Sequence, residues 1–207
     1  VQAESGVHLP KENYLQAIRK RCDETGTLLI FDECQTGFGR TGKLFAFDHF
    51  NVVPDILLLG KAVGGGMPLG AFIASKEKMH VFTSGPMLGH ITTFGGHPVC
   101  CAAGLAAAEF VTTNHLIEHV YSKATRIKSA LNHSKIKAIR NLGLFFAVEL
   151  ESMEVNFSLN KKLLAAGVMI DWFLFAPHCL RIAPPHTISD EEIYFACALI
   201  MQLLDEV

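Results

Sequence analysis

Long apolar runs are missing from this 207-residue sequence, and charged residues make up only 18% of it. No run approaches the roughly 18 to 20 apolar residues that a membrane-spanning helix needs, and the N-terminus lacks the basic-then-apolar pattern of a signal peptide. The 18 Lys and Arg nearly balance the 20 Asp and Glu, giving a net charge of −2 without a basic block. We therefore expect neither nucleic acid nor a membrane as a partner.

Cysteine and histidine patterns that bind metals are also missing. The six cysteines include no C-x-x-C pair, and four of them lie in apolar or helical patterns, where free thiols act as small hydrophobic residues. This usage indicates a reducing compartment, and we expect a cytoplasmic protein. The ten histidines are scattered without zinc-ligand spacing, so no metal site is predicted.

Half of the residues are hydrophobic, and the length allows one large domain or two modest ones. Apolar runs and helical patterns alternate along the chain without internal repeats. The expected strands cover 28–31, 56–59, 70–75, 136–140, 144–150, 168–173 and 180–183. The expected helices cover 11–24, 101 to about 131 with a break near Asn114, 159–166 and 189–204. From residue 132 the order β, β, α, β, β, α predicts a small α+β domain.

Two of the expected strands end in groups that can do chemistry. The run 28–31 leads into Asp32, and the run 56–59 leads into Gly60 and Lys61. Short apolar runs bounded by Gly and charge are typical of strands covered on both faces, and open α/β sheets bind ligands at the carboxyl ends of their strands. A lysine amine that forms a Schiff base and an aspartate that holds a ring nitrogen protonated would suit pyridoxal phosphate (PLP).

The triple glycine Gly64–Gly66 invites a nucleotide-loop interpretation, which the surrounding residues do not support. A Rossmann turn needs G-x-G-x-x-G between a strand and a helix, and a P-loop needs G-x-x-x-x-G-K-S/T. Neither pattern is present. A turn that lets the backbone pass close to a cofactor explains these glycines better.

Several motifs resemble those of the class III (omega-type) aminotransferases, in particular the ornithine, acetylornithine and 4-aminobutyrate enzymes. They occur in the family's order across nearly the whole chain: FDECQTGFGRTGK at 31–43, PDI at 54–56, GKA at 60–62, GGGMPLGA at 64–71, TTFGGHP at 92–98 and LRIAPP at 180–185.

The resemblance implies an α/β, fold-type I PLP transferase. Residues 1–131 would be the C-terminal part of the large PLP-binding domain with the interdomain helix, and 132–207 the small C-terminal α+β domain. In the family, the segment that resembles residues 2–7 lies about midway along the polypeptide. We therefore expect this chain to lack roughly the N-terminal half, which carries the phosphate-cupping turn and the aromatic residue that stacks on the ring.

The family's cofactor-binding roles fall on four positions. Lys61 would form the internal aldimine and then move a proton at the substrate α-carbon. Asp32 would pair with the pyridine nitrogen, and Gln35 would touch the ring hydroxyl. Thr93 would bind the cofactor phosphate of the neighbouring subunit, which implies a homodimer with a shared active site. Asp32 as a helix cap and Thr93 as an ordinary turn residue, with Thr92 as a change of register, remain alternatives.

The family's substrate-binding roles fall on two further positions. Arg181 matches the arginine that binds the substrate carboxylate, since a planar guanidinium grips a carboxylate with two hydrogen bonds. Glu4 matches the glutamate that covers this arginine during one half-reaction, although a solvated loop residue is the alternative.

The implied reaction is ping-pong transfer of an amino group from an amino acid or amine donor to a 2-oxo acid such as 2-oxoglutarate. The same scaffold also hosts aminomutases, epimerases and decarboxylases. A further alternative is an inactive fragment without the phosphate-binding half.

Overall fold

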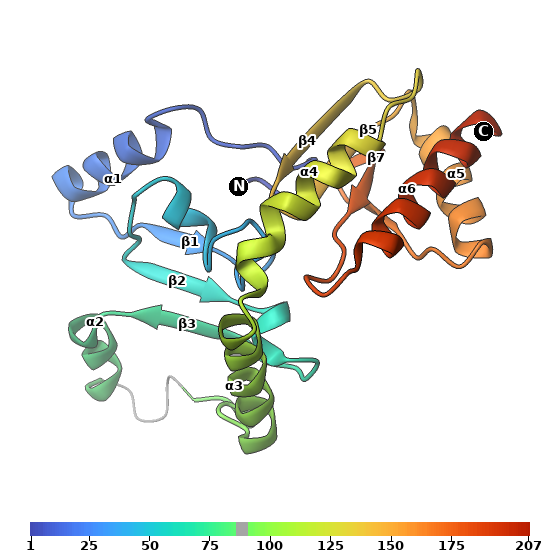
Figure 1. Ribbon diagram of the computed structural model, residues 1–207. Coiled ribbons are helices and arrows are strands. Elements are labelled where there is room, and N and C mark those ends of the chain that lie inside the picture. Colours follow the sequence, from blue (N-terminus) through green and yellow to red (C-terminus); the bar gives the residue numbers. More distant parts are fainter. Residues whose placement is uncertain (86–90) are drawn as a thin grey trace. The chain divides into compact units, whose positions relative to one another are not determined.

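The computed structural model describes residues 1–85 and 91–207, which form two compact units (Figure 1). Unit 1 consists of Val1–Pro10, Gly39–Gly42 and His115–Val207. Unit 2 consists of Lys11–Phe38 and Lys43–Asn114. The sequence of 76–90, which mixes charge with Ser-Gly-Pro, indicates a helical turn followed by an exposed loop, and residues 86–90 of it lie outside the described residues.

The compact units do not coincide with the predicted segments 1–131 and 132–207. The predicted helix break at Asn114 is present, and the helix that follows it, α4 (Val120–Ala130), belongs to unit 1. It does so because Val120 and Ile127 are buried in the same hydrophobic core as α6 (Asp190–Asp205). The assignment of the first segment to a larger PLP-binding domain stays a prediction.

Unit 2 contains a sheet in the order β1-β2-β3. Strands β1 (Ile30–Asp32) and β2 (Ile56–Leu59) are parallel, and β3 (Ala71–Ala74) is antiparallel to β2. The arrows for these strands lie side by side in Figure 1. The helices of this unit are α1 (Tyr14–Thr25), α2 (Lys76–His80) and α3 (Pro98–Thr113), with 3-10 turns η1 (Ala46–His49), η2 (Lys61–Gly64) and η3 (Val81–Thr83). Gly26 ends α1 in the left-handed conformation, with φ 67°.

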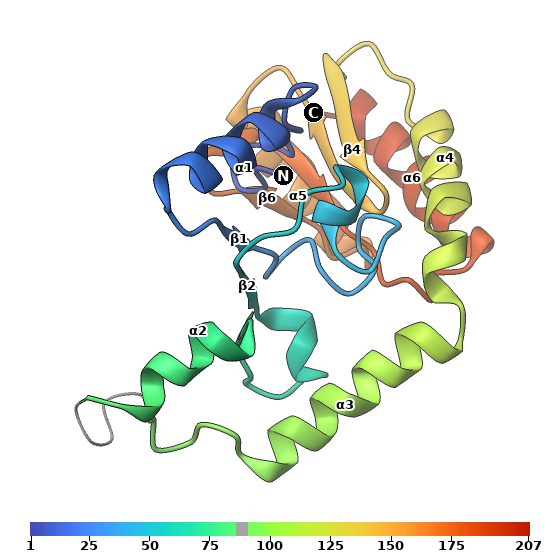
Figure 2. The ribbon, with the colours of Figure 1, turned by 90° about the vertical axis from the view of Figure 1, so that its left-hand side faces the viewer.

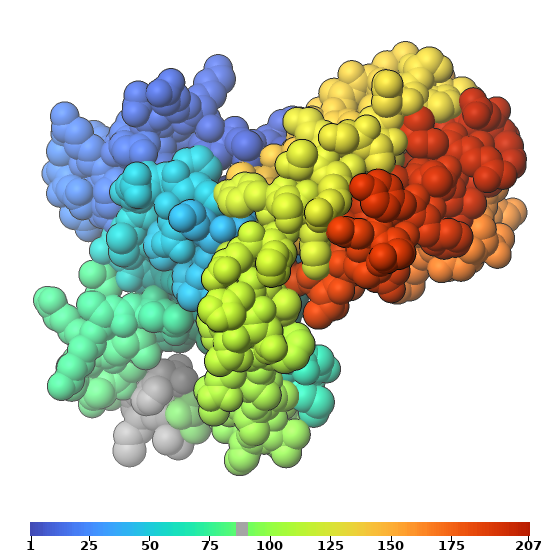
Figure 3. Space-filling model, in the orientation of Figure 1, coloured from blue at the N-terminus to red at the C-terminus, as the bar shows by residue number. Residues whose placement is uncertain are grey.

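The prediction that the strands at 28–31 and 56–59 are covered on both faces is wrong for β1 in the described chain, whereas no residue of β2 is exposed. Ile30 is 51% exposed and Ile73 52%. On α3, Leu105 is 61% exposed and Phe110 52%, and the space-filling view shows one side of this helix uncovered (Figure 3). No element of unit 2 within the described residues packs on these side chains. They are therefore apolar but exposed in this part of the chain.

Asp55 ties together the elements on which the sheet of unit 2 is built. Its Oδ2 accepts hydrogen bonds from the Leu29 amide at 2.9 Å and from Arg19 Nη1 of α1 at 2.7 Å. Lys78 Nζ of α2 lies 3.1 Å from Oδ1. The Leu29 amide, followed by the Arg19 and Lys78 hydrogen bonds, holds the pKa of the Asp55 carboxyl well below its usual range.

Unit 1 contains a sheet in the order β4-β5-β7-β6, with every neighbouring pair antiparallel. Its strands are β4 (Ala138–Leu142), β5 (Phe145–Glu149), β6 (Asp171–Phe173) and β7 (Ala176–Ile182). Besides α4 and α6 it has η4 (Leu116–His119) and α5 (Met153–Ala165). The predicted order β, β, α, β, β, α from residue 132 is therefore confirmed.

Side-chain caps decide where two helices of unit 1 begin. Ser189 and Glu192, which have the S-x-x-E spacing in the sequence, form a capping box at the start of α6. Helix α5 begins earlier than predicted, because the Ser152 hydroxyl accepts a hydrogen bond from the Val155 amide at 3.3 Å. The sequence analysis overlooked this serine cap.

The two faces of the unit 1 sheet are covered differently. Phe146, Val148 and Leu180 point into a core shared with α4, α5 and α6. The alternate residues Phe145 and Cys179 form a second cluster with the N-terminal segment. Figure 2 shows α4 and α6 on one side of β4 and the N-terminus on the other. The sheet is thus buried on both faces.

The segment 39–42 joins unit 1 through hydrogen bonds of the Arg40 side chain and main chain with main-chain groups of that unit. Arg40 Nη1 donates to the carbonyls of Leu144, at 3.1 Å, and Pro184. The Leu144 amide in turn donates to the Arg40 carbonyl at 3.0 Å. Burial lowers the pKa of Arg40. The FDECQTGFGRTGK motif therefore contributes residues to both compact units.

Replacing Asp55 tests this network. We expect Asp55→Asn to destabilise the chain by roughly 1 to 3 kcal/mol at pH 7, because it removes charge-assisted hydrogen bonds. The folded-state pKa of Asp55 is depressed, so its contribution is present above the unfolded pKa of about 3.9 and is lost as the pH falls. Urea unfolding of both proteins between pH 7 and 3 should show the difference shrinking. As a control, Asp23→Asn removes an exposed partner of Arg19 and should cost less than about 1 kcal/mol. A difference for Asp55→Asn that is independent of pH would contradict this account.

Candidate functional site

Asp32 and Lys61 follow two neighbouring parallel strands. Asp32 is the last residue of β1 and pairs in register with Leu58 of β2. Lys61 lies three residues beyond Leu58 and opens η2. Because parallel strands end at the same edge of a sheet, both groups lie at the edge where α/β sheets bind ligands. Both residues are exposed, so the described residues do not make this a dry site.

Lys61 has an unusual backbone conformation. Its φ is 49°, in the left-handed region that residues other than glycine seldom adopt. The turn that holds it is closed by hydrogen bonds from the Val63 amide to the Gly60 carbonyl, at 3.2 Å, and from Gly65 to Ala62, at 3.1 Å. Such a conformation costs on the order of 1 kcal/mol or more and persists where the surroundings impose it.

Cys34 interacts with both Asp32 and Lys61. Its amide donates to Asp32 Oδ1 at 2.9 Å, which orients the carboxylate. Burial, together with hydrogen bonding to Asp32 and its charge, raises the pKa of the Cys34 thiol, while the charge of Lys61 acts in the opposite direction. The thiol therefore lies within electrostatic reach of both residues.

Glu33 has a structural role that the sequence analysis did not assign. It is 4% exposed and accepts hydrogen bonds from the amides of Ala46, at 3.0 Å, and Phe47, at 2.9 Å, and from the Thr36 hydroxyl. It thereby closes the segment between β1 and η1. The available signal was strand alternation: if Asp32 faces outward, the next residue faces the opposite side.

Gln35 and Thr93 lie in turns. Gln35 is half-buried in the turn that follows β1, near the end of the strand that carries Asp32. Thr93 is exposed in the turn before α3. His97 occupies the N-cap position of that helix, but its side chain makes no capping hydrogen bond. The cofactor contacts of Gln35 and Thr93 stay predictions.

Arg181 is held by two carboxylates in unit 1. Its Nη1 donates to Glu4 Oε1 at 3.0 Å, and its Nη2 donates to Asp171 Oδ2 at 2.7 Å. The guanidinium also lies over the Phe173 ring, 5.5 Å from the centroid. The structure thus brings together the predicted pair Glu4 and Arg181.

Both carboxylates that contact Arg181 are held in place by the fold. Glu4 is fixed by main-chain hydrogen bonds, and Asp171, which the sequence pattern did not indicate, by strand pairing. The Leu174 amide donates to Glu4 Oε2 at 3.1 Å, and the Phe175 amide donates to the Glu4 carbonyl at 3.0 Å. Asp171 faces Arg181 because these residues are directly paired across β6 and β7. That register depends on the turn between the strands, and the sequence pattern alone did not reveal it.

An apolar cavity of about 620 Å³ in unit 1 adjoins this charged cluster, since Asp171 and Arg181 belong to its lining. Its lining includes Ile182, Ile193 and Ile200, on the helix-covered side of the sheet. The Arg181 guanidinium, at one border of the cavity, lies over the Phe173 ring. Among the described residues, Asp171 and Arg181 are the only charged residues in the lining, so the cavity adds no further charged group to the candidate site.

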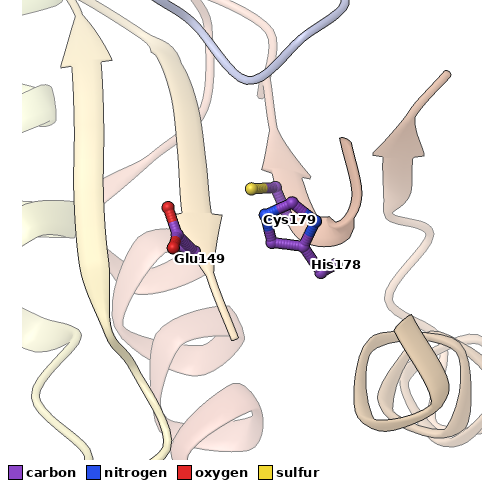
Figure 4. A group of neighbouring side chains, drawn as sticks. All are labelled: Glu149, His178 and Cys179. Carbon is purple, nitrogen blue, oxygen red and sulfur yellow. The ribbon is translucent and has the colours of Figure 1, made fainter. Parts of the chain in front are cut away.

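Glu149, His178 and Cys179 lie close together in unit 1 (Figure 4), with one possible ligand atom of each within 4.8 Å of the others. Arg140 contacts this group, donating to Glu149 Oε2 at 2.5 Å and to Cys179 Sγ at 3.3 Å. A guanidinium in this position repels a divalent cation. Burial raises the pKa of the Cys179 thiol, which opposes formation of the thiolate that a metal needs. The absence of a metal site stays a prediction, now with a physical reason.

Comparison with known families decides where the chain belongs. Residues 1–204 match the family model described as aminotransferase class-III. The chain belongs to this family. Class III aminotransferases depend on PLP. Similar curated proteins include a putrescine aminotransferase from Pectobacterium atrosepticum, 40% identical over 100% of this chain and 45% of its own length. An acetylornithine aminotransferase from Caldanaerobacter subterraneus is 39% identical over 100% of this chain and 52% of its own length.

Solved structures give the same family and fold. The ornithine aminotransferase from Toxoplasma gondii is 33% identical, with a TM-score of 0.89, and is covered over 50% of its length by 100% of this chain. A transaminase from Virgibacillus is 26% identical, with a TM-score of 0.90 and 51% of its length covered by 100% of this chain. The predicted α/β, fold-type I class is confirmed, and the chain spans about half the length of the relatives it matches. Across the described residues, no helix combines the length and apolarity required to cross a membrane.

Titration with Co²⁺ tests the group around Cys179. We expect no saturable thiolate-to-cobalt absorption band, because Arg140 already neutralises Glu149 and the thiol is protonated. Cys179→Ala serves as the control, and its spectrum should match that of the unmodified chain. A stoichiometric band that disappears in Cys179→Ala would show that these residues bind metal after all.

Proposed function

We propose that this chain carries the cofactor lysine and the substrate-binding arginine of a PLP-dependent aminotransferase. The reaction is ping-pong transfer of an amino group from an amino acid or amine to a 2-oxo acid, with 2-oxoglutarate as the expected acceptor. The observation that carries the proposal is the placement of Asp32 and Lys61 after adjacent parallel strands, within a chain that matches the family along nearly its whole length. A homodimer in the cytoplasm is part of the proposal.

The residues at this sheet edge fit PLP. When bound, the cofactor supplies an aldehyde that captures amines and a protonated ring that withdraws electrons. Lys61 offers a primary amine on a turn with a defined backbone conformation. Asp32 offers a carboxylate oriented by the Cys34 amide. Gln35 follows on the same segment and would touch the ring hydroxyl.

Lys61 would move the proton that the reaction requires. Its free amine would accept a proton from the substrate α-carbon and hold it for later transfer. Asp32 stabilises a positive charge at the pyridine nitrogen, an interaction that strengthens as water leaves the site. In the described chain both side chains are exposed. We therefore expect weak cofactor binding by these residues alone, which agrees with a chain half the length of its relatives.

Arg181 and Glu4 would act as a switch for the substrate carboxylate. With the 3.0 Å ion pair closed, Glu4 neutralises the arginine, which suits an amine donor without a nearby carboxylate. With the pair open, the guanidinium can grip the carboxylate of a 2-oxo acid. Asp171 remains on the other terminal nitrogen and would hold the guanidinium in place in both states.

The assignment of Lys61 can be tested by reduction with borohydride. After incubation with PLP, peptide mapping should place most of the pyridoxyl label on Lys61, because it lies at the ligand-binding edge of the sheet. Lys43 and Lys76 are exposed lysines of the same unit and serve as internal controls. Predominant labelling of either control would rule out the proposed role. Lys61→Arg, which keeps the charge, should remove the label.

The assignment of Arg181 can be tested with Arg181→Lys in an active preparation of the protein. We expect the half-reaction with the 2-oxo acid to slow by at least about tenfold, because lysine keeps the charge but cannot form two parallel hydrogen bonds. The half-reaction with an amine donor should change less, since Glu4 already covers the arginine in that step. Single-turnover kinetics separates the two, with Glu4→Gln for comparison. Equal losses in both half-reactions would exclude the switch.

A further inference from the structure

The turn that carries Lys61 lies directly against α3, and two glycines make this approach possible. A Cβ atom added to Gly104, in the interior of α3, would lie 2.5 Å from the Val63 carbonyl oxygen of η2. A Cβ atom added to Gly65, just after η2, would lie 2.3 Å from the Ala103 carbonyl oxygen. Both obstructing atoms belong to the main chain, so they cannot be moved aside by rotating a side chain.

Glycine at position 104 needs an explanation because the rest of the helix favours alanine. The segment CAAGLAAA at 101–108 is strong helix-forming sequence apart from this residue. A glycine in a helix interior costs roughly 0.5 to 1 kcal/mol relative to alanine. The helix itself does not require glycine, whereas the contact with Val63 does.

The contact between Gly104 and Val63 affects Lys61 through the short, closely packed segment 61–63. Val63 is 9% exposed and packs with Leu57 and Leu59 of β2. On the other side of Lys61, a Cβ atom at Gly60 would lie 3.0 Å from the Cys34 sulfur. A shift of Val63 away from α3 must therefore be absorbed by the turn that begins at Lys61, whose left-handed backbone leaves few alternatives.

We infer that Gly104 and Gly65 are positioning residues for Lys61. Their contact sets the distance between α3 and η2 and thereby places the lysine amine at the end of β2. The inference rests on the proposed function, because it takes Lys61 to be the residue that reacts with the cofactor aldehyde.

The test uses Gly104→Ala in the 207-residue chain, with PLP as the probe. The rate of borohydride-trapped labelling at Lys61 is measured relative to that at Lys76. We expect this ratio to fall at least threefold, while circular dichroism shows helix content unchanged or slightly higher, since alanine favours helix. The matched control is Gly70→Ala, whose added Cβ would come no closer than 3.7 Å to the Leu59 carbonyl oxygen. The labelling ratio of Gly70→Ala should equal that of the unmodified chain, because its added Cβ atom obstructs nothing. Taking the ratio of Lys61 to Lys76 labelling also cancels a general loss of stability, which affects both lysines.

A second pair of variants covers the case in which Gly104→Ala does not fold. Asparagine tolerates the left-handed conformation better than other side chains, so Gly65→Asn adds the obstructing Cβ atom with less backbone strain than alanine would cause. Gly66→Asn is the control, because nothing lies within 4 Å of its added Cβ atom. We expect Gly65→Asn to lower the Lys61 ratio and Gly66→Asn to leave it unchanged. An unchanged ratio in folded Gly104→Ala or Gly65→Asn would overturn the inference.

Hydrogen exchange separates failure of this inference from failure of the proposed function. If the unmodified chain labels Lys61 no faster than Lys76, the proposed function fails. The positioning contact is then judged by amide exchange in residues 61–66, which should rise at least threefold in Gly104→Ala and stay unchanged in Gly70→Ala. Equal exchange in both variants would refute the contact between α3 and η2.

Discussion

Parallel pairing of β1 with β2 is the constraint on which the candidate cofactor site depends. Only because these strands run in the same direction do Asp32 and Lys61 lie at one edge of the sheet. Asp55 fixes the start of this pairing, since its amide donates to the Leu29 carbonyl at 2.8 Å and its carboxylate accepts from the Leu29 amide. A carboxylate remote from the chemistry thus sets the strand register that places the chemical groups.

Two adjacent carboxylates at the end of β1 have opposite environments. Asp32 is exposed and available to a ligand, whereas Glu33 is buried and receives two main-chain amides and a hydroxyl. Strand alternation separates them, and the buried carboxylate organises the segment behind the exposed one. The same division recurs in unit 1, where Arg181 meets Asp171 and Glu4 on one face of β7 while Leu180 enters the core on the other.

Charge balance explains why two neighbouring arginine clusters suit different tasks. Arg140 is surrounded by Glu149, the Cys179 sulfur and the Gly6 carbonyl, contacts that use its donors internally and discourage a metal. Arg181 is paired with two carboxylates that are at least a quarter exposed. Ion pairs near the surface are worth little more than about 1 kcal/mol, so a competing carboxylate can open one of them. Solvent exposure is similar for the Arg140–Glu149 and Arg181–Glu4 pairs. Arg181 is the better candidate for binding a substrate because Asp171 can hold it when Glu4 is displaced.

The sequence by itself determined the local elements, because helix caps, strand runs and turn glycines act over a few residues, as at Gly26 and Ser189. Its motifs also determined the family and the candidate residues. Only the tertiary structure decided which groups meet: the pairing of Asp171 with Arg181, the burial of Glu33, and the glycine contact between α3 and η2. These depend on strand register and on main-chain distances between segments far apart in the chain, which no local pattern encodes. Burial of β1 was overestimated for the same reason, since an apolar sequence indicates only a preference for burial, and the folded chain shows whether other elements provide it.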